Sequence, residues 1–256
     1  MQANGSAFGQ IVLYSHMGGG AAAFGEGESP VEQKPYALFD FDGTLIRGDS
    51  IVRFLRYAHM RGLVSAGGLV RAGLCAALYG LRLLTAEEAK RRSLAFLKGR
   101  GEKEVAALAE GFCHEVLVPA LYPDGVREMR RRSAEGAEIL LISASPAFYL
   151  EPLKRVLPIS AVIATRMDVE DGVYTGLLFG ENCRGVQKPL RLAEYLAARG
   201  EMVDYAASWA YGDSAGDLPM LTLCGHKVAV NAKRRLVKRL QGADGVAFLR
   251  FEQPRE

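Results

Sequence analysis

The sequence has few of the residues that form metal–thiolate sites or basic surfaces for nucleic acids. Its four cysteines and four histidines lie far apart, with neither a CxxC pair nor a Cys/His cluster at metal-ligand spacing. This pattern is typical of free thiols in a reducing compartment. The formal net charge is only +3 for 256 residues, and lysine and arginine are spread over several segments. We therefore expect no nucleic-acid partner.

The first 34 residues lack sustained apolar periodicity and include the small-residue run GGGAAAFGEGESP. This composition predicts a flexible N-terminal tail over residues 1–34. A secretory signal would need a basic start and a continuous apolar centre before a small-residue cleavage site, and the segment supplies no such pattern. We therefore expect a cytoplasmic location.

Three short apolar runs end abruptly at polar residues. They are ALF before Asp40, EILLI before Ser143, and SWAY before Gly212 and Asp213. Runs that are apolar on both faces suit buried strands of a parallel sheet, and the segments between them have helical spacing. These helical segments are 117–136, 147–157 and 190–200. The predicted fold class is α/β, with a Rossmann-like parallel sheet, and ligands of such sheets bind beyond the carboxyl ends of the strands.

Between the first two strands the pattern becomes helical throughout. We predict an inserted helical domain over residues 51–119, so that residues 35–50 and 120–256 form the core. Thr85 and Glu88 are spaced as a capping box at the start of one inserted helix. A second insertion, VIATRMDVEDGVYTGLLFG, alternates on both sides of its Asp-Gly turn like a β-hairpin.

Asp40 and Asp42 lie two residues apart at the end of the first strand, so both side chains can face the same cleft. Two close carboxylates repel each other unless a cation or a shared proton relieves the repulsion. Asp213 and Asp217, in GDSAGDLPM, add acidic oxygens at the same edge, and such a set suits Mg²⁺. Lys188 then supplies a fixed positive charge.

Four elements, FDFDGTL, LLISAS, Lys188 and YGDSAGD, occur in this order. Together they resemble the four motifs of the haloacid dehalogenase superfamily of phosphatases. The helical insertion after the first motif resembles the small cap of the phosphoserine-phosphatase-like branch. The resemblance covers residues 36–251.

This resemblance implies a Mg²⁺-dependent phosphomonoesterase that acts on a small-molecule substrate. It makes Asp40 the nucleophile that forms an aspartyl-phosphate and Asp42 the general acid and base. It implies that Ser143 forms a hydrogen bond to a phosphoryl oxygen and that Lys188 orients Asp40 and offsets negative charge. The implied metal ligands are Asp40, Asp42 through its carbonyl, Asp213 and Asp217, and the implied phosphate-binding residues are Gly43, Thr44, Ser143, Ala144 and Lys188.

Three positions depart from the pattern of phosphoserine phosphatases, which usually have Ser, Glu and Asn where this chain has Gly43, Asp49 and Gly216. Asp49 is a candidate to bind a substrate ammonium group and equally a candidate helix N-cap. Arg91 and Arg92 lie near the place where that branch has a substrate-binding arginine. We expect a phosphoserine-like amino-acid or amino-alcohol phosphate as substrate, without committing to phosphoserine itself.

Two alternatives stay open at this point. The stretch 62–84 is long and apolar, but Arg71 and the pair Gly67–Gly68 favour two packed helices over a membrane span. Contact with a membrane surface and a lysophospholipid-like phosphate as substrate form the first alternative. A non-enzymatic phospho-accepting or ligand-binding domain is the second, although receiver domains have adjacent acids and no cap.

Overall fold

The computed structural model describes residues 33–252. Most of the expected tail, residues 1–32, lies outside the described residues. The expectation was wrong for Gln33–Lys34, which form strand β1 and pair in parallel with β6 (Met202–Val203). The predicted end of the tail was misplaced because Gln33 and Lys34 are polar and do not form an apolar run. A strand forms through backbone hydrogen bonds, which do not require apolar side chains.

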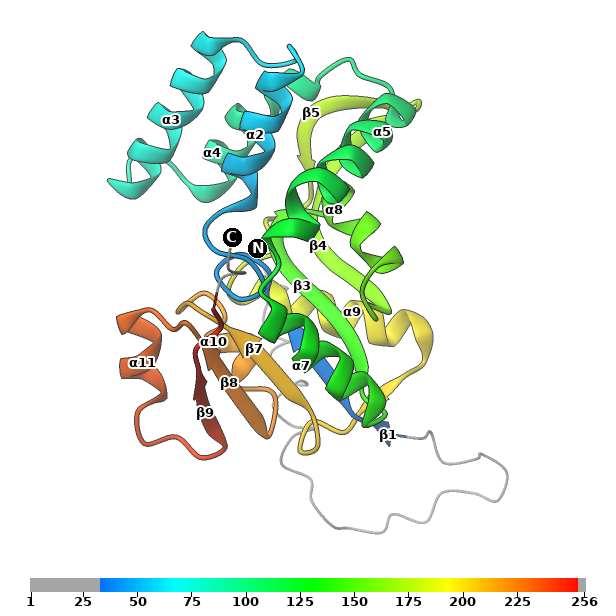
Figure 1. Ribbon diagram of the computed structural model, residues 1–256, viewed down its shortest axis with the longest axis vertical. Coiled ribbons are helices and arrows are strands. Elements are labelled where there is room, and N and C mark those ends of the chain that lie inside the picture. Colours follow the sequence, from blue (N-terminus) through cyan, green and yellow to red (C-terminus); the bar gives the residue numbers. More distant parts are fainter. Residues whose placement is uncertain (1–32, 253–256) are drawn as a thin grey trace, which may run out of the picture. The chain divides into compact units, whose positions relative to one another are not determined.

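A seven-stranded sheet with strand order β5-β4-β3-β2-β7-β8-β9 forms the centre of the fold (Figure 1). Every neighbouring pair is parallel except β4 and β5, which are antiparallel and form the expected hairpin. The α/β prediction is confirmed. The strands are β2 (Tyr36–Phe39), β3 (Glu138–Pro146), β4 (Ala161–Glu170), β5 (Val173–Phe179), β7 (Trp209–Gly212), β8 (His226–Val230) and β9 (Val246–Leu249).

Helices cover both faces of this sheet, because alternate strand residues point to opposite sides. Leu38 of β2 packs with residues of α9 (Gln187–Arg199), α10 (Leu218–Leu221) and α11 (Arg234–Leu240). Phe39 packs on the other side with residues of α7 (Pro123–Ala134) and of the inserted helices. All four residues of β2 are fully buried, as expected for a central parallel strand.

The chain between β2 and α7 is helical, as the sequence predicted. Its helices are α2 (Ser50–Met60), α3 (Ala66–Gly80), α4 (Ala86–Leu94), η1 (Ala95–Leu97), α5 (Glu102–Phe112), the π-helical η2 (Cys113–Leu117) and α6 (Val118–Ala120). Thr85 caps α4 by accepting a hydrogen bond from the Glu88 amide. None of the described helices combines the length and the apolar character needed to cross a membrane.

Two expected helices are shorter than predicted. The segment 117–136 breaks at Leu121–Tyr122, and α7 begins at Pro123, which suits the first turn of a helix because proline has no amide to donate. The segment 147–157 divides into α8 (Ala147–Leu150) and the 3₁₀ helix η3 (Glu151–Arg155). Aromatic rings of α8 and the insertion pack together, as in the contact of Phe112 with Tyr149, so the insertion shares a core with the sheet.

Candidate active site

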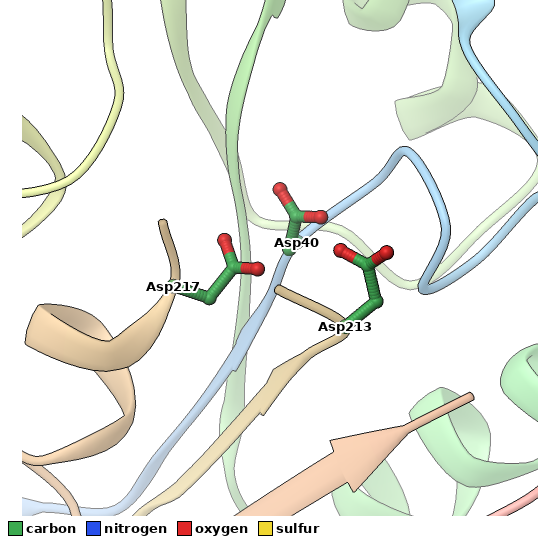
Figure 2. A group of neighbouring side chains, drawn as sticks. All are labelled: Asp40, Asp213 and Asp217. Atoms are coloured by element: carbon green, nitrogen blue, oxygen red, sulfur yellow. The ribbon is translucent and has the colours of Figure 1, made fainter. Parts of the chain in front are cut away.

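The strand-end carboxylates meet at one place. Asp40 follows β2, and Asp213 follows the neighbouring parallel strand β7. Asp217 lies at the start of α10. One carboxylate oxygen from each of the three lies within 4.8 Å of the others, and all three residues are buried (Figure 2). The sequence prediction that these acids share one site agrees with this geometry.

Lys188 is the buried cation of the site. It lies in the first turn of α9, is only 1% exposed, and donates to Asp40 Oδ1 at 2.6 Å and to Asp217 Oδ1 at 2.7 Å. Burial alone would lower the pKa of Lys188, but the charges of Asp217 and Asp40 raise it above its ordinary value. Lys188 is therefore a permanent ammonium group that orients two carboxylates.

The two carboxylates that contact Lys188 differ in their hydrogen bonding. Asp217 also accepts from the amide and hydroxyl of Ser214; burial opposes its ionisation, yet Lys188 and these bonds hold its pKa below the usual value. Burial and repulsion from Asp217 raise the pKa of Asp40, against the effect of Lys188. Asp40 Oδ1 faces Lys188, whereas Oδ2 has a 3.3 Å contact from the Thr44 hydroxyl.

The donor set fits a small divalent cation. Asp213 has a partner in Lys233, at 2.6 Å, so three buried carboxylates face two ammonium groups and a negative charge remains. The loop after β2 can approach Asp213 closely because residue 43 is a glycine. Gly43 has φ +88°, and any side chain there would place a Cβ against the Asp213 carboxylate. Clustered carboxylate oxygens with uncompensated charge are the ligands that Mg²⁺ prefers.

Asp42 lies outside this carboxylate group. Its side chain accepts from the Ser50 amide at 2.8 Å and the Ser50 hydroxyl at 3.1 Å, at the start of α2, and from the Ser145 hydroxyl. Burial and the charge of Asp49 raise its pKa, and the bonds from Ser145 and Ser50 oppose the rise. A carboxyl group with a raised pKa can hold a proton near neutral pH, as a general acid must.

A bulge at the end of β3 forms the second wall of the site. Ser143 pairs with Ala164 of β4, but the next pair is Pro146 with Thr165, so Ala144 and Ser145 have no partners in the ladder. The Ser143 hydroxyl is buried and accepts from the Ser145 amide at 3.0 Å. Ser145, which the sequence analysis missed, is the residue of the bulge that contacts Asp42.

The amide of Gly43, expected to bind phosphate, is committed elsewhere in this structure. It donates to the carbonyl of Ile46 at 2.8 Å and so closes the turn after β2. The turn has to rearrange before this N–H can reach a ligand. Thr44 is fully buried and contacts Asp40, in agreement with its expected place at the site.

A cavity of about 440 Å³ adjoins the site at Asp42. The inserted helices α2, α3 and α4 form one wall, and the β3 bulge and the loop before α9 form the other. Its charged lining residues are Asp42, Asp49, Arg56, Lys90 and Arg184, and most of the others are apolar or small. The cavity has the size and the mixed lining of a small-molecule site.

Of the three expected substrate residues, only Asp49 lines this cavity. It is also the N-cap of α2, since its Oδ1 accepts from the Ile51 amide at 2.8 Å. The structure does not bring Arg91 and Arg92 to the cavity: both side chains are exposed, neither lines it, and Arg92 pairs with Glu88 on the helix surface. The register of α4 turns these residues away from the site.

Lys90 is the cation of α4 that faces inward. The residue is only 7% exposed, and its ammonium group donates to Asn182 Oδ1 at 2.6 Å and to the Ala144 carbonyl of the bulge. Burial lowers the pKa of Lys90 to about 8. Glu87 of the same helix accepts from the Asn182 amide at 2.9 Å. These contacts tie α4 both to the bulge and to the loop that precedes Lys188.

Comparisons with known proteins agree with this geometry. The profile of the haloacid dehalogenase-like hydrolases matches residues 37–222. A phosphoserine phosphatase of Mycobacterium tuberculosis is 32% identical over 226 residues, covering 84% of this chain and 71% of the relative. A histidinol-phosphatase of Neisseria meningitidis is 31% identical over 208 residues, covering 80% and 94%. A crystal structure of a Bordetella pertussis protein of unknown function is 29% identical, with a TM-score of 0.77 and coverage of 84% and 98%.

Proposed function

Since the chain belongs to the haloacid dehalogenase-like hydrolases and is a phosphatase of that family, we propose that it hydrolyses phosphomonoesters with Mg²⁺ through an aspartyl-phosphate on Asp40. The observation that carries this proposal is the group of three buried carboxylates whose oxygens lie within 4.8 Å, with Lys188 bonded to two of them. The phosphatase relatives, and not this cluster, argue against non-enzymatic phosphate acceptance.

The two oxygens of Asp40 suit different tasks. Lys188 holds Oδ1, which orients the carboxylate and leaves Oδ2 to attack phosphorus. An Asp40–phosphate bond forms as the ester bond breaks, and Asp42 gives its proton to the departing alkoxide. Asp42 then takes a proton from water, which attacks the same phosphorus and releases inorganic phosphate and free Asp40. The raised pKa of Asp42 fits both proton transfers.

Mg²⁺ would be held by the side chains of Asp40 and Asp213 and the backbone carbonyl of Asp42, with Asp217 supporting them. When bound, it offsets the repulsion between the anionic nucleophile and the anionic phosphate. We assign the phosphoryl oxygens to Thr44, to Ser143 and to the backbone N–H of Ala144. The N–H of Gly43 joins them once the turn that holds it on the Ile46 carbonyl rearranges. These assignments rest on the strand-end position of the residues.

Residues 51–119 act as the cap of this enzyme, and residues 35–50 and 120–256 as its core. The cavity beneath the inserted helices holds the alcohol part of the substrate. Closing it excludes water from the aspartyl-phosphate until the leaving alcohol has gone. The four cysteines are free and buried, which supports a reducing, cytoplasmic location.

We assign the substrate to small amino-acid or amino-alcohol phosphates. The helix amides bind Asp49 through Oδ1, so Oδ2 is available to an ammonium group in the cavity. Arg56 and Arg184 line the same cavity and suit a carboxylate or another acceptor. The histidinol-phosphatase and phosphoserine phosphatase relatives act, by their names, on substrates of this class.

A lysophospholipid-like phosphate is the second candidate. The observation that favours it is the apolar wall of the cavity, to which α3 contributes Leu69, Ala72 and Ala76 and α2 contributes Ile51 and Leu55. An alkyl or acyl body gains free energy from such a wall, whereas an amino alcohol does not.

A substrate panel tests the proposal. Release of phosphate would be measured from p-nitrophenyl phosphate and from amino-acid, amino-alcohol, sugar and lysophospholipid phosphates, with Mg²⁺ and after chelation. We expect Mg²⁺-dependent turnover of p-nitrophenyl phosphate and the highest kcat/KM for an amino-acid or amino-alcohol phosphate. Asp49→Ala should change the ranking, and Arg92→Ala, on the exposed face of α4, is the matched control. A lysophospholipid phosphate at the head of the ranking would favour the second candidate.

A further inference from the structure

Helix α3 is mostly apolar, yet the fold hardly uses it as a core helix. Of its 15 residues only Ala72 and Cys75 are buried. The helix packs against α2 and α4, and Figure 1 shows it at the outer edge of this group, with no further element on its other side. Its apolar sequence is therefore unexplained by packing within the described residues.

The exposed apolar side chains of α3 share one face. Val70 is 73% exposed and Leu74 58% exposed, and Leu81, which follows the helix, is 69% exposed. With Ala77 they are spaced i, i+4, i+7 and i+11, which places them along one stripe. Single exposed apolar residues need no explanation, but a contiguous stripe marks an interaction surface. We call this stripe, together with the equally exposed Leu83, the outer face of α3.

The outer face is separate from the face that lines the cavity. The cavity is lined by Leu69, Ala72, Gly73, Ala76 and Tyr79, which lie on another side of the same helix at 100° per residue. Helix α3 alone therefore lies between the substrate cavity and the outer face.

The chain segment that contains the outer face carries charge of one sign. From Ser50 to Ala86 the sequence contains five arginines and neither aspartate nor glutamate. Arg61 pairs with Glu115, outside that stretch. Arg71 and Arg82 are exposed, and no described carboxylate pairs with either. An apolar stripe flanked by unpaired arginines complements a surface that is apolar within and anionic outside.

We propose that the outer face of α3, with Arg71 and Arg82, docks this protein on an anionic lipid bilayer. The apolar stripe enters the boundary between headgroups and acyl chains, and the two arginines contact anionic headgroups. Docked in this way, the cap lies against the bilayer, with the substrate cavity directly behind α3. The docking does not depend on the proposed phosphatase chemistry, since none of its residues lines the cavity.

Co-sedimentation with vesicles tests the docking without using turnover. The full chain would be mixed with vesicles of phosphatidylcholine alone, or of phosphatidylcholine and phosphatidylglycerol in equal parts. We expect binding to the anionic vesicles that weakens as salt is raised, and at least a tenfold weaker interaction with the neutral ones. Leu74→Glu/Leu81→Glu and, separately, Arg71→Glu/Arg82→Glu should each weaken binding at least tenfold.

Matched controls separate the surface from general effects of charge. Leu177→Glu/Leu249→Glu introduces the same two charges at leucines of β5 and β9 that are 48% and 38% exposed, and Arg130→Glu/Arg239→Glu removes two exposed arginines elsewhere. Both controls should bind vesicles as the unchanged protein does, and all variants should keep its melting temperature and its hydrolysis of p-nitrophenyl phosphate. The proposal is overturned if the unchanged protein does not bind anionic vesicles or if the leucine variants bind them equally well. It is also overturned if these variants instead dissociate a dimer that binds no vesicles, because the outer face is then an interface between two copies.

Discussion

Replacing Lys188 with methionine tests the electrostatics of the site through stability. Methionine keeps most of the volume of the side chain but removes the ammonium group, so Asp40 and Asp217 lose their bonds of 2.6 and 2.7 Å. The side chains of Lys188, Asp40 and Asp217 are only 2%, 9% and 4% exposed, so water cannot replace the lost partner. The variant therefore leaves buried carboxylates with little compensation.

The cost of breaking a buried ion pair from one side is roughly 3–5 kcal/mol. In a chain of this size each kcal/mol lowers the melting temperature by about 2–4 °C, so we expect a decrease of roughly 6–20 °C at pH 7. Calorimetry or circular dichroism measures it. Lys154→Met is the matched control, because Lys154 pairs with Glu151 at the surface with 40% and 47% exposed side chains. Removing such a pair costs at most about 1 kcal/mol.

The destabilisation of Lys188→Met should depend on pH. In the unchanged protein the pKa of Asp217 is depressed, so its contribution to stability is present above the unfolded value near 3.9 and is lost as the pH falls through the folded pKa. Without the ammonium group both carboxyls have folded pKa values above the unfolded one, and protonation in acid relieves them. The difference between the two proteins should therefore close as the pH falls. A loss below about 1 kcal/mol that is the same at every pH would refute the reasoning.

Three other outcomes follow from the geometry. Asp42→Asn should slow turnover by roughly 10²–10⁴-fold, because an amide cannot transfer the proton; the single-turnover rate measures this, and a normal rate would remove Asp42 from the chemistry. Because Lys90 lines the cavity and Arg91 does not, Lys90→Met should raise KM or lower kcat and Arg91→Met should change neither. In the unchanged protein kcat/KM should fall as the pH rises through about 8, where Lys90 loses its proton. If Lys90→Met has the same pH profile, Lys90 is not the cause of that fall. Chelation of Mg²⁺ should abolish turnover and lower the melting temperature, and readdition should restore both; a melting temperature that ignores Mg²⁺ contradicts a metal site at Asp40 and Asp213.

The sheet and the strand-end acids could be predicted because their signals are local. A buried parallel strand reads as an apolar run, and Asp40 and Asp213 directly follow such runs, so topology alone brings them together. The strands β8 and β9 were not predicted, because no catalytic motif follows HKVAV or VAFL and the basic helix α11 lies between them. Their place in the sheet depends on pairing with β7, which is not local in sequence.

The substrate residues were harder to predict because they depend on helix register. Arg91 and Arg92 differ from Lys90 by one and two positions, which is a rotation of about 100° and 200° around α4. The signal was present: Ala86, Lys90 and Ser93 are spaced i, i+4 and i+7, and all three line the cavity. Choosing that face required knowing which side of the helix meets the β3 bulge. Ser145 was missed for a related reason, since a bulge that redirects a side chain leaves no local pattern.

The central claim is that phosphate passes through the side chain of Asp40. Intact-mass spectrometry after rapid acid quench, during hydrolysis of p-nitrophenyl phosphate with Mg²⁺, tests it most directly. Because Asp42→Asn slows the water attack, we expect a single phosphate adduct that accumulates in this variant and maps to the peptide containing Asp40. Asp40→Asn is the control. It should show no adduct, and its turnover should fall by several orders of magnitude. Near-normal turnover in Asp40→Asn, or a phosphate adduct on another residue, would contradict the account.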